Sequence, residues 1–347
     1  MRMPSNASLR VGILGASGFT GAELLRIAAR HRNFSVGVVA AATQAGSMVA
    51  EVHPQLAAAY RDQRFSSVDP EAVDGYDIVF LGLPHEASLD LVPELLGRVG
   101  CVVDLSAAYR LRDTAGYPAY YGFEHTQPEV LASAVYGLPE FHRAALRGAT
   151  LVATPGCYVT AAIMALRPLV AAGLVERDGL IVDAASGVTG AGRREELAYS
   201  FTTVDENLTA YGLVGHRHTP EMEQEIGAQV LFTPHLAPMN RGILATCYSR
   251  PADPSSMSTE VVLGALRAQY ADEPFVVVTD TIPGTKATLG SNMVLVTGRY
   301  DARTRTVITI AALDNLAKGA SGGAVQAANV ALGLTESEGL DLVGVAP

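Results

Sequence analysis

Residues 10–21, RVGILGASGFTG, place a glycine-rich turn between a short apolar run and the beginning of a helical pattern. A helix N-terminus in this position offers N–H groups and the positive end of the helix dipole to a phosphate, and glycine permits a tight turn and the close approach of a pyrophosphate. A purely structural glycine turn is the alternative. We therefore predict a dinucleotide site formed by Gly15, Ala16, Ser17, Gly18, Phe19, Thr20 and Gly21.

The first half of the chain continues the pattern that this turn begins. Short apolar runs at 10–14, 35–41, 77–84, 100–106 and 150–156 alternate with helical patterns, such as those that begin near Thr20 and Glu86. Strands that alternate with helices predict a parallel sheet covered on both faces. We expect a doubly wound α/β domain of the Rossmann type.

The second half of the chain shows a different succession of predicted strands and helices. A helix of about 15 residues is expected after Cys157, and longer strand-like runs then follow with fewer helices between them, at 179–186, 229–236, 242–249, 291–300 and 306–314. This succession predicts a mixed sheet in an α+β domain. We expect the first domain to comprise 1–156 and 315–347, whose small-residue helix returns to it, and the second domain to comprise 157–314.

The composition excludes several classes of protein. Of the 347 residues 49% are hydrophobic, the net charge is -10, and no basic stripe is present, so neither a nucleic acid nor a membrane surface is an expected partner. Three widely spaced cysteines argue for a reducing compartment. The longest apolar helix candidate, 161–175, is interrupted by Arg167 and Pro168, and too few apolar residues precede Gly15 for a signal peptide. A cytoplasmic protein is expected.

The segment after the second predicted strand bears on the choice of cofactor. NAD-selective sites usually carry an acidic residue here for the ribose 2′-hydroxyl, but no acidic residue occurs between Glu23 and Glu51. Thr43 and Gln44 could donate hydrogen bonds to a 2′-phosphate instead. The sequence favours NADP(H), and an NAD enzyme with a neutral loop is the alternative.

Cys157, in the segment PGCY, differs in position from the other cysteines. It joins the end of a predicted strand to the beginning of a helix, where the helix dipole stabilises a thiolate and the N–H groups can receive an oxyanion. Cys101 and Cys247 lie inside apolar runs, as inert core residues do. Cys157 is therefore the candidate nucleophile.

The segment GHRHTPE (215–221) supplies candidate proton carriers. Thr219 as N-cap and Pro220 at the first helical position predict a helix, with His216 and His218 on the loop before it, two residues apart and facing the same way. One imidazole could act as general acid or base, while Arg217 or the other imidazole binds a substrate anion. Surface histidines and a zinc pair are the alternatives, but no third ligand has a persuasive spacing, so we expect no metal.

A series of motifs along nearly the whole chain resembles the N-acetyl-gamma-glutamyl-phosphate reductase family, within the aspartate-semialdehyde and glyceraldehyde-phosphate dehydrogenase type of architecture. They are GASGFTG (15–21), LPHEAS (83–88), DLSAAYRL (104–111), YYGFEH (120–125), YGLPE (136–140), TPGCY (154–158), SGVTGAGR (186–193), HRHTPE (216–221), PMNRGILAT (238–246), LGSN (289–292) and DNLAKGASGGAVQ (314–326). The resemblance implies a Rossmann domain completed by the C-terminal helix, an inserted α+β domain for substrate and oligomerisation, NADP(H), and a homo-oligomer (dimer or tetramer).

The resemblance also implies roles for single residues. Cys157 resembles the family's catalytic cysteine, and His216 and His218 its acid/base and substrate-orienting pair; which is which stays open, with a slight preference for His216 as the acid because His218 adjoins the helix cap. Arg110 resembles the arginine that receives the acyl phosphate, with a surface ion pair as its alternative. The remaining residues that it implies are Ser186, Arg217 and Glu221 for the substrate and Gly187, Gly190, Gly192 and Asn315 near the nicotinamide.

The activity implied is NADPH-dependent reduction of an acyl phosphate, a small molecule, to an aldehyde through a thioester on Cys157. One alternative is a reductase of aminoadipyl phosphate on an acidic carrier protein, which the net charge of -10 disfavours because such a carrier calls for a basic docking face. A non-catalytic dinucleotide-binding sensor is the other. The position of Cys157 at a predicted helix N-terminus, together with the HRHTPE segment, argues against the sensor.

Overall fold

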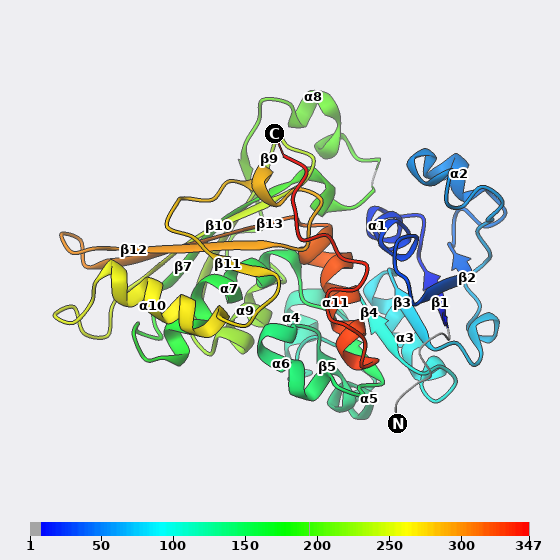
Figure 1. Cartoon of the computed structure of the whole chain (residues 1–347), viewed down its shortest axis with the longest axis horizontal. Coiled ribbons are helices and arrows are strands. Elements are labelled where there is room, and N and C mark those ends of the chain that lie inside the picture. The colour runs from blue at the N-terminus through cyan, green and yellow to red at the C-terminus, as the bar shows by residue number, and fades with distance from the viewer. Residues whose placement is uncertain (1–7, 194, 347) are drawn as a thin grey trace. The chain divides into compact units, whose positions relative to one another are not determined.

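The computed structural model describes residues 8–193 and 195–346, and the chain divides into two units (Figure 1). The first unit comprises residues 1–115, 123–155 and 320–340, and the second comprises 116–122, 156–319 and 341–347. The return of the chain to the first unit therefore begins at Ala320, five residues later than the predicted position, and the last residues count with the second unit.

The first unit is built on a six-stranded parallel sheet, which confirms the predicted α/β class. Its strands are β1 (Leu9–Leu14), β2 (Phe34–Ala40), β3 (Ile78–Leu81), β4 (Val102–Asp104), β5 (Val135–Tyr136) and β6 (Leu151–Ala153), in the order β2-β1-β3-β4-β6-β5. The chain passes from β1 to β2 on one side and then crosses back to β3 on the other side of β1. The carboxyl ends of β1 and β3 thus form a switch point, where doubly wound sheets bind ligands.

Helices complete the core of the first unit. They are α1 (Phe19–Ala28), α2 (Val49–Val52), α3 (His85–Leu95), α5 (Pro128–Ser133), α6 (Pro139–Leu146) and α11 (Gly322–Ala331). Small apolar residues of α11 share a buried cluster with Leu24 and Leu25 of α1 and with Val103 of β4. The C-terminal helix therefore belongs to the core of the first unit, and its alanines permit the close approach.

The second unit contains a seven-stranded mixed sheet in the order β11-β12-β13-β10-β7-β9-β8. Its strands are β7 (Leu180–Gly187), β8 (Thr209–Ala210), β9 (Val230–Ala237), β10 (Ile243–Ser249), β11 (Val276–Val278), β12 (Val294–Asp301) and β13 (Thr306–Leu313), and its helices are α4 (Gly116–Tyr121), α7 (Cys157–Ala171), α8 (Phe201–Val204), α9 (Thr219–Ile226) and α10 (Thr259–Tyr270). The sequence did not predict the edge strands β8 and β11, which are two and three residues long. Such short runs carry no readable alternation.

Burial alternates along the central strands of this sheet. Val182 of β7, Phe232 of β9 and Cys247 of β10 are buried, whereas the residues beside them are partly buried or, for Leu231, exposed. α7 packs on β10 and β13, and nearly all of its residues are buried. One face of the sheet is thus covered by helices, and the other is more open.

The predicted helix of about 15 residues after Cys157 is confirmed, and α7 runs through Pro168 without interruption. Proline has no N–H, so the carbonyl of Met164, four residues earlier, lacks its usual intrahelical donor. The hydroxyl of Tyr270, at the end of α10, donates to this carbonyl at 2.8 Å and is itself buried. The tyrosine supplies the hydrogen bond that the proline removes.

Replacing Tyr270 with Phe should therefore lower the free energy of unfolding by about 1–3 kcal/mol, since it leaves a buried carbonyl unsatisfied. In a Pro168→Ala background the new amide of residue 168 can donate to Met164, and the same Tyr270→Phe change should cost less. Denaturant unfolding of the four proteins forms a double-mutant cycle that measures this coupling. Equal costs in both backgrounds would contradict it.

Candidate active site

The glycine turn after β1 has the shape of a phosphate-binding loop. Gly15 has a φ of 88°, and a Cβ added there would lie 2.3 Å from the carbonyl oxygen of Gly82. A Cβ on Gly21 would lie 2.4 Å from the Cα of Ala16, but one on Gly18, the N-cap of α1, would meet nothing within 4 Å. The outer glycines therefore allow the turn and the helix packing, and the middle one leaves open space before the helix N-terminus, as a bound pyrophosphate requires.

The remaining cofactor and substrate candidates of the first unit lie in two other loops. Thr43 is exposed on the turn after β2. Arg110 is buried, and its Nη2 donates to the carbonyl of Leu105 at 2.8 Å. The fully buried Asp104 has its carboxyl pKa raised by burial, an effect that Ser106 and the Arg110 charge oppose. Arg110 is therefore not a surface ion-pair residue, and its role toward phosphate remains a prediction.

Cys157 is the first residue of α7, half-buried, with Gly156 as the N-cap. The first hydrogen bond of the helix runs from the N–H of Thr160 to the carbonyl of Gly156 at 2.9 Å, so the preceding N–H groups of the turn have no intrahelical acceptor. Gly319 packs directly against Cys157, since a Cβ added to Gly319 would lie 2.9 Å from the Cβ of Cys157. Burial raises the pKa of the Cys101 thiol to about 12 and also raises that of Cys247. Only Cys157 sits at a helix N-terminus.

Glu221 holds the residue that precedes the nucleophile. It is fully buried in the first turn of α9, and its Oε1 accepts a hydrogen bond from the N–H of Gly156 at 3.0 Å. A buried carboxylate bound to the backbone in this way positions the N-terminus of α7, and the role of Glu221 toward substrate remains a prediction.

The two histidines meet at the beginning of α9. The helix starts at Thr219 with His218 as its N-cap, so the predicted cap at Thr219 is wrong by one residue. His218 already has helical angles (φ -82°, ψ -12°), and its carbonyl accepts from the N–H of Met222. The segment is a turn and not the extended run expected, yet the rings of His216 and His218 lie 4.8 Å apart between centroids.

His218 is the histidine placed against the nucleophile's helix. It is 9% exposed, and a Cβ added to Gly156 would lie 2.6 Å from His218 Nε2. His216 lies farther into an aromatic cluster, and burial followed by the neighbouring Arg217 charge lowers its pKa to about 4. A neutral His216 does not fit the preference for this residue as the acid. The geometry favours His218. Arg217 is exposed, and its carbonyl accepts from the hydroxyl of Tyr121.

The loop SGVTGAGR is anchored by Asn315. Asn315 is buried; its Oδ1 accepts from the N–H of Gly242 at 2.7 Å, and its Nδ2 donates to Thr189 Oγ1 at 2.9 Å. Gly187 touches the neighbouring loop, since an added Cβ would lie 2.7 Å from the N of Arg241. Asn315 thus joins these loops, and its contact with nicotinamide remains a prediction. The other loop residues are the buried Ser186, the exposed Gly190, and the exposed Gly192 with a φ of 82°.

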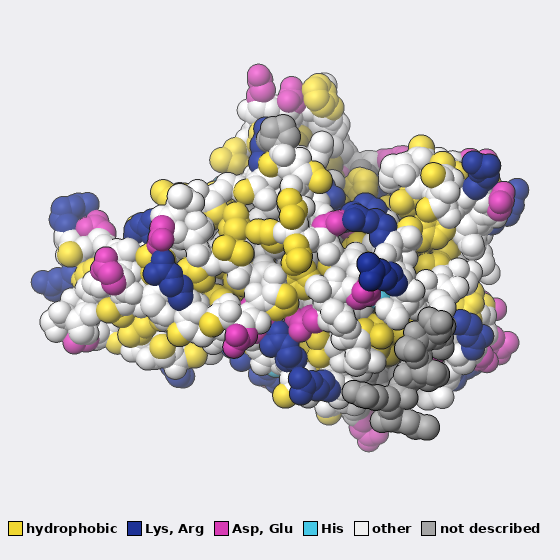
Figure 2. Space-filling model, in the orientation of Figure 1, with side chains coloured by type: hydrophobic (Ala, Val, Ile, Leu, Met, Phe, Trp, Pro, Cys, Tyr) yellow, Lys and Arg dark blue, Asp and Glu magenta, His cyan; other side chains and the backbone are white. Residues whose placement is uncertain are grey.

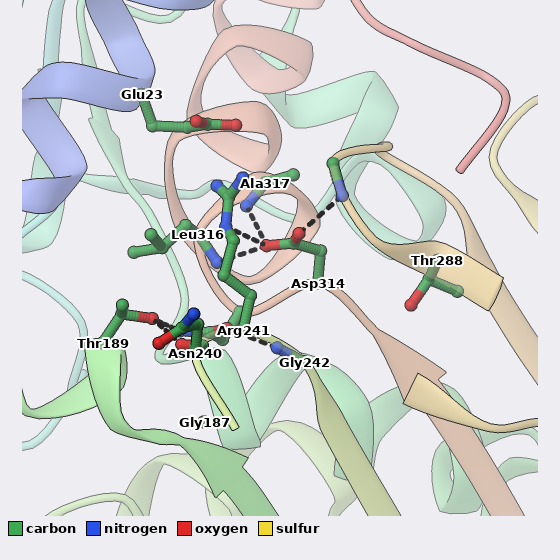
Figure 3. A network of polar contacts seen from close by, with 12 residues as sticks. Glu23, Gly187, Thr189, Asn240, Arg241, Gly242, Thr288, Asp314, Leu316 and Ala317 are labelled. Carbon is green, nitrogen blue, oxygen red and sulfur yellow. Dashed lines mark hydrogen bonds and ion pairs between the residues drawn. The ribbon is translucent and has the colours of Figure 1, made fainter. Parts of the chain in front are cut away.

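The sequence reasoning missed the pair Asp314 and Arg241, drawn in Figure 3. Asp314 is fully buried, with Arg241 Nε 3.4 Å from its Oδ1. Its carboxylate also accepts from the N–H groups of Gly290, Leu316 and Ala317. The charge pair fixes the end of β13 and the turn that leads to Gly319. Both residues lie inside quoted motifs, but nothing in the spacing indicated that they would meet.

Comparison with known proteins connects this site to a family. A model described as "Semialdehyde dehydrogenase, NAD binding domain" matches residues 10–149, and one described as "Semialdehyde dehydrogenase, dimerisation domain" matches residues 157–315. Proteins named N-acetyl-gamma-glutamyl-phosphate reductase match nearly end to end: that of Symbiobacterium thermophilum is 45% identical over 96% of this chain and 97% of its own, and that of Geobacter sulfurreducens is 44% identical over 98% and 100%. The chain belongs to the N-acetyl-gamma-glutamyl-phosphate reductase family. The resemblance seen in the motifs is confirmed, as is a nicotinamide dinucleotide as cofactor.

Solved structures support the family's fold. Aspartate semialdehyde dehydrogenase II of Vibrio cholerae, complexed with ASA, aligns with a TM-score of 0.68 over 93% of this chain and 98% of its own, at 17% identity. The aspartate semialdehyde dehydrogenase of Candida albicans with NADP gives 0.68 over 93% and 98%, at 16% identity. The predicted Rossmann unit with an α+β unit is confirmed.

Glu221 gives the test of the positioning geometry. Glu221→Gln keeps an oxygen for the Gly156 N–H, whereas Glu221→Ala removes it, so Ala should lower kcat by about 10- to 100-fold through misplacement of Cys157 and Gln by much less. The rate of Cys157 alkylation by iodoacetamide, together with thermal unfolding, reports on the same change without substrate. Equal kcat values in the wild type and Glu221→Ala would show that Glu221 does not position the nucleophile.

Proposed function

We propose that this protein reduces N-acetyl-L-glutamyl 5-phosphate to N-acetyl-L-glutamate 5-semialdehyde with NADPH, a step of arginine biosynthesis, through a thioester on Cys157. The observation that carries the proposal is the placement of Cys157 as the first residue of α7, with the ring of His218 against Gly156 beside it. The printed names of the full-length relatives supply the substrate.

The first step uses the N-terminus of α7. The Cys157 thiolate, favoured there by the helix dipole, attacks the acyl carbon; the carbon–oxygen bond to phosphate breaks, and phosphate leaves with the electron pair. N–H groups of the first helical turn stabilise the oxyanion formed on the way. We assign Arg110 to the leaving phosphate, for which a guanidinium is suited. Ser186 and Arg217 are assigned to the rest of the substrate.

His218 handles the proton of the second step. Addition of hydride to the thioester carbonyl gives a tetrahedral adduct that is still bound to Cys157. When this adduct collapses to the aldehyde, the carbon–sulfur bond breaks and its electron pair returns to sulfur. A proton on His218 stabilises the departing sulfur, and in the reverse direction the imidazole takes the thiol proton. We therefore assign His218, and not His216, as the acid and base, from its contact with Gly156.

The residues of the first unit fit a dinucleotide. Gly15 to Gly21 provide the turn, and Gly18 leaves open space before the N-terminus of α1. We assign Thr43 to the adenosine 2′-phosphate and Gly187, Gly190, Gly192 and Asn315 to the nicotinamide end. NADPH supplies the hydride when it is bound. The lack of an acidic residue between Glu23 and Glu51 supports NADPH over NADH.

The oligomeric state belongs to this proposal. A cross-strand row on the more open face of the second sheet contains Leu231, Ile181, Tyr248 and Ile308, and Leu231 is 56% exposed. An apolar row of this kind supports a homodimer or homotetramer formed through the sheet. A monomeric mass in sedimentation would contradict this.

The surface charge and the helices bear on the partners of the enzyme and on its place in the cell. None of the helices within 8–193 and 195–346 is long and apolar enough to cross a membrane. Figure 2 shows basic and acidic side chains interspersed on the face in view, and the net charge is -10, which supports small-molecule partners over nucleic acids. We propose that the enzyme acts in the cytoplasm.

The test is reduction of NADP⁺ with N-acetylglutamate semialdehyde in the presence of phosphate or arsenate. We expect turnover that exceeds turnover of aspartate semialdehyde. Cys157→Ser should bind NADP⁺ normally but lose turnover by about 10³-fold or more, because an un-ionised serine hydroxyl is a far weaker nucleophile than the thiolate. Cys247→Ala, inside the core, is the matched control and should keep the mechanism. Turnover by Cys157→Ser that equals the wild type would exclude a thioester.

A further inference from the structure

The hydrogen bond between the two histidines fixes the protonation of one of them. The backbone N–H of His218 donates to Nδ1 of His216 at 3.1 Å. An imidazole nitrogen can accept only when it carries no proton, so a neutral His216 must hold its proton on Nε2. A cationic His216 would carry a proton on both nitrogens and would lose this bond.

The surroundings of His216 favour that neutral form. Its ring contacts Tyr158 of α7, Tyr211 after β8 and Phe232 of β9, with centroids 6.1, 5.6 and 5.0 Å away. Burial raises the pKa of Tyr211 to about 12 and raises that of Tyr158 as well, so both phenols are uncharged at neutral pH. The Arg217 guanidinium opposes a second positive charge next to it.

The tyrosines are themselves held in place. Tyr158 donates from its hydroxyl to the carbonyl of His235 at 2.8 Å, and Tyr211 donates to the hydroxyl of Tyr158 at 3.3 Å. The N–H of Tyr211 is bound to the carbonyl of Pro234. Because Tyr158 follows Cys157 on α7, this cluster connects the nucleophile's helix with the loop that carries both histidines.

We propose that His216 is a positioning residue that stays neutral throughout the reaction and uses its Nδ1 to cap the N–H of His218, so that the His218 ring remains against Gly156 and Cys157. This inference rests on the proposed function for the identity of the reaction, but the capping bond itself does not depend on any substrate. The two histidines of HRHTPE then have different tasks. His218 exchanges a proton, and His216 must not.

Low pH should weaken the hydrogen bond between His216 and the N–H of His218, because it protonates His216. The pKa of His216 is lowered by burial and by Arg217 from 6.5 to about 4. As the pH falls through that range, the unfolded chain takes up a proton at this residue before the folded protein does. The contribution of neutral His216 to stability is therefore complete above this range and is lost progressively within it.

Nitrogen-15 NMR of the histidine-labelled wild-type protein tests the tautomer directly. We expect the His216 ring to show an unprotonated Nδ1 and a protonated Nε2 at neutral pH and to keep them when the pH is lowered to about 5; the spectrum of His216→Asn assigns the signal by its loss. A proton on Nδ1, or a titration midpoint between pH 6 and 7, would overturn the proposal.

Three variants test the cap in the assay. His216→Asn places an oxygen where Nδ1 lies, His216→Gln carries its oxygen farther out, and His216→Phe keeps the ring shape without an acceptor. We expect His216→Asn to keep kcat within about 3-fold and the pH profile unchanged, whereas Gln and Phe lower kcat by about 10- to 100-fold through misplacement of His218. Melting curves confirm that each variant is folded.

The outcomes separate the possible roles. Equal loss in all three variants, with the disappearance of one limb of the pH profile, would show that His216 is the proton donor and would overturn the proposal. Full activity in all three would overturn it as well. If the wild type lacked acyl-phosphate reductase activity, the proposed function would fail, yet the NMR result would still decide whether His216 is a neutral cap.

Discussion

The hydrogen bond from the Gly156 N–H to the buried carboxylate of Glu221 is the constraint on which the candidate site depends. It joins the N-termini of α7 and α9, and these two helix starts carry Cys157 and His218. Side chains on rigid helices keep their geometry better than side chains on loops, and a nucleophile needs its proton partner within a narrow range of positions. A carboxylate between two helix N-termini is also favoured by both dipoles.

The close approach of these elements depends on glycine. A Cβ on Gly156 would overlap His218, and a Cβ on Gly319 would press on Cys157. Asp314 and Arg241 in turn hold the turn that carries Gly319, through the backbone N–H groups that the carboxylate accepts. The nucleophile is therefore enclosed by backbone on two sides, and the positions of these backbones are set by buried ionisable groups. Buried charges that are paired and hydrogen-bonded in this way specify one geometry at the cost of desolvation.

The sequence predicted the fold because its strands and turns carry local signals. The apolar runs of the first unit, the glycine turn and the strand-to-helix position of Cys157 could each be read within a few residues. Edge strands β5, β8 and β11 were missed because they are too short for an alternating pattern. The helix across Pro168 was predicted, but the donor that compensates for the proline, Tyr270, was not, because it is far away in the sequence.

The candidate site was predictable only in part, because its deciding contacts also join residues that are far apart in the sequence. Residue type and helix start singled out Cys157, but nothing local shows that the carboxylate of Glu221 turns inward to Gly156. The distinction between His216 and His218 rests on a backbone hydrogen bond and on aromatic neighbours from α7 and β9. These contacts are tertiary, and spacing along the chain does not contain them.

The central claim is that the acyl group is carried on Cys157, and trapping of this intermediate tests it most directly. The protein would be mixed with N-acetylglutamate semialdehyde and NADP⁺ without phosphate, quenched in acid, digested and analysed by mass spectrometry. We predict an N-acetylglutamyl group on the peptide that contains Cys157, which is released when phosphate is added before the quench. An unmodified Cys157 peptide from protein that turns over once phosphate is supplied, or an acyl group on another residue, would contradict the account.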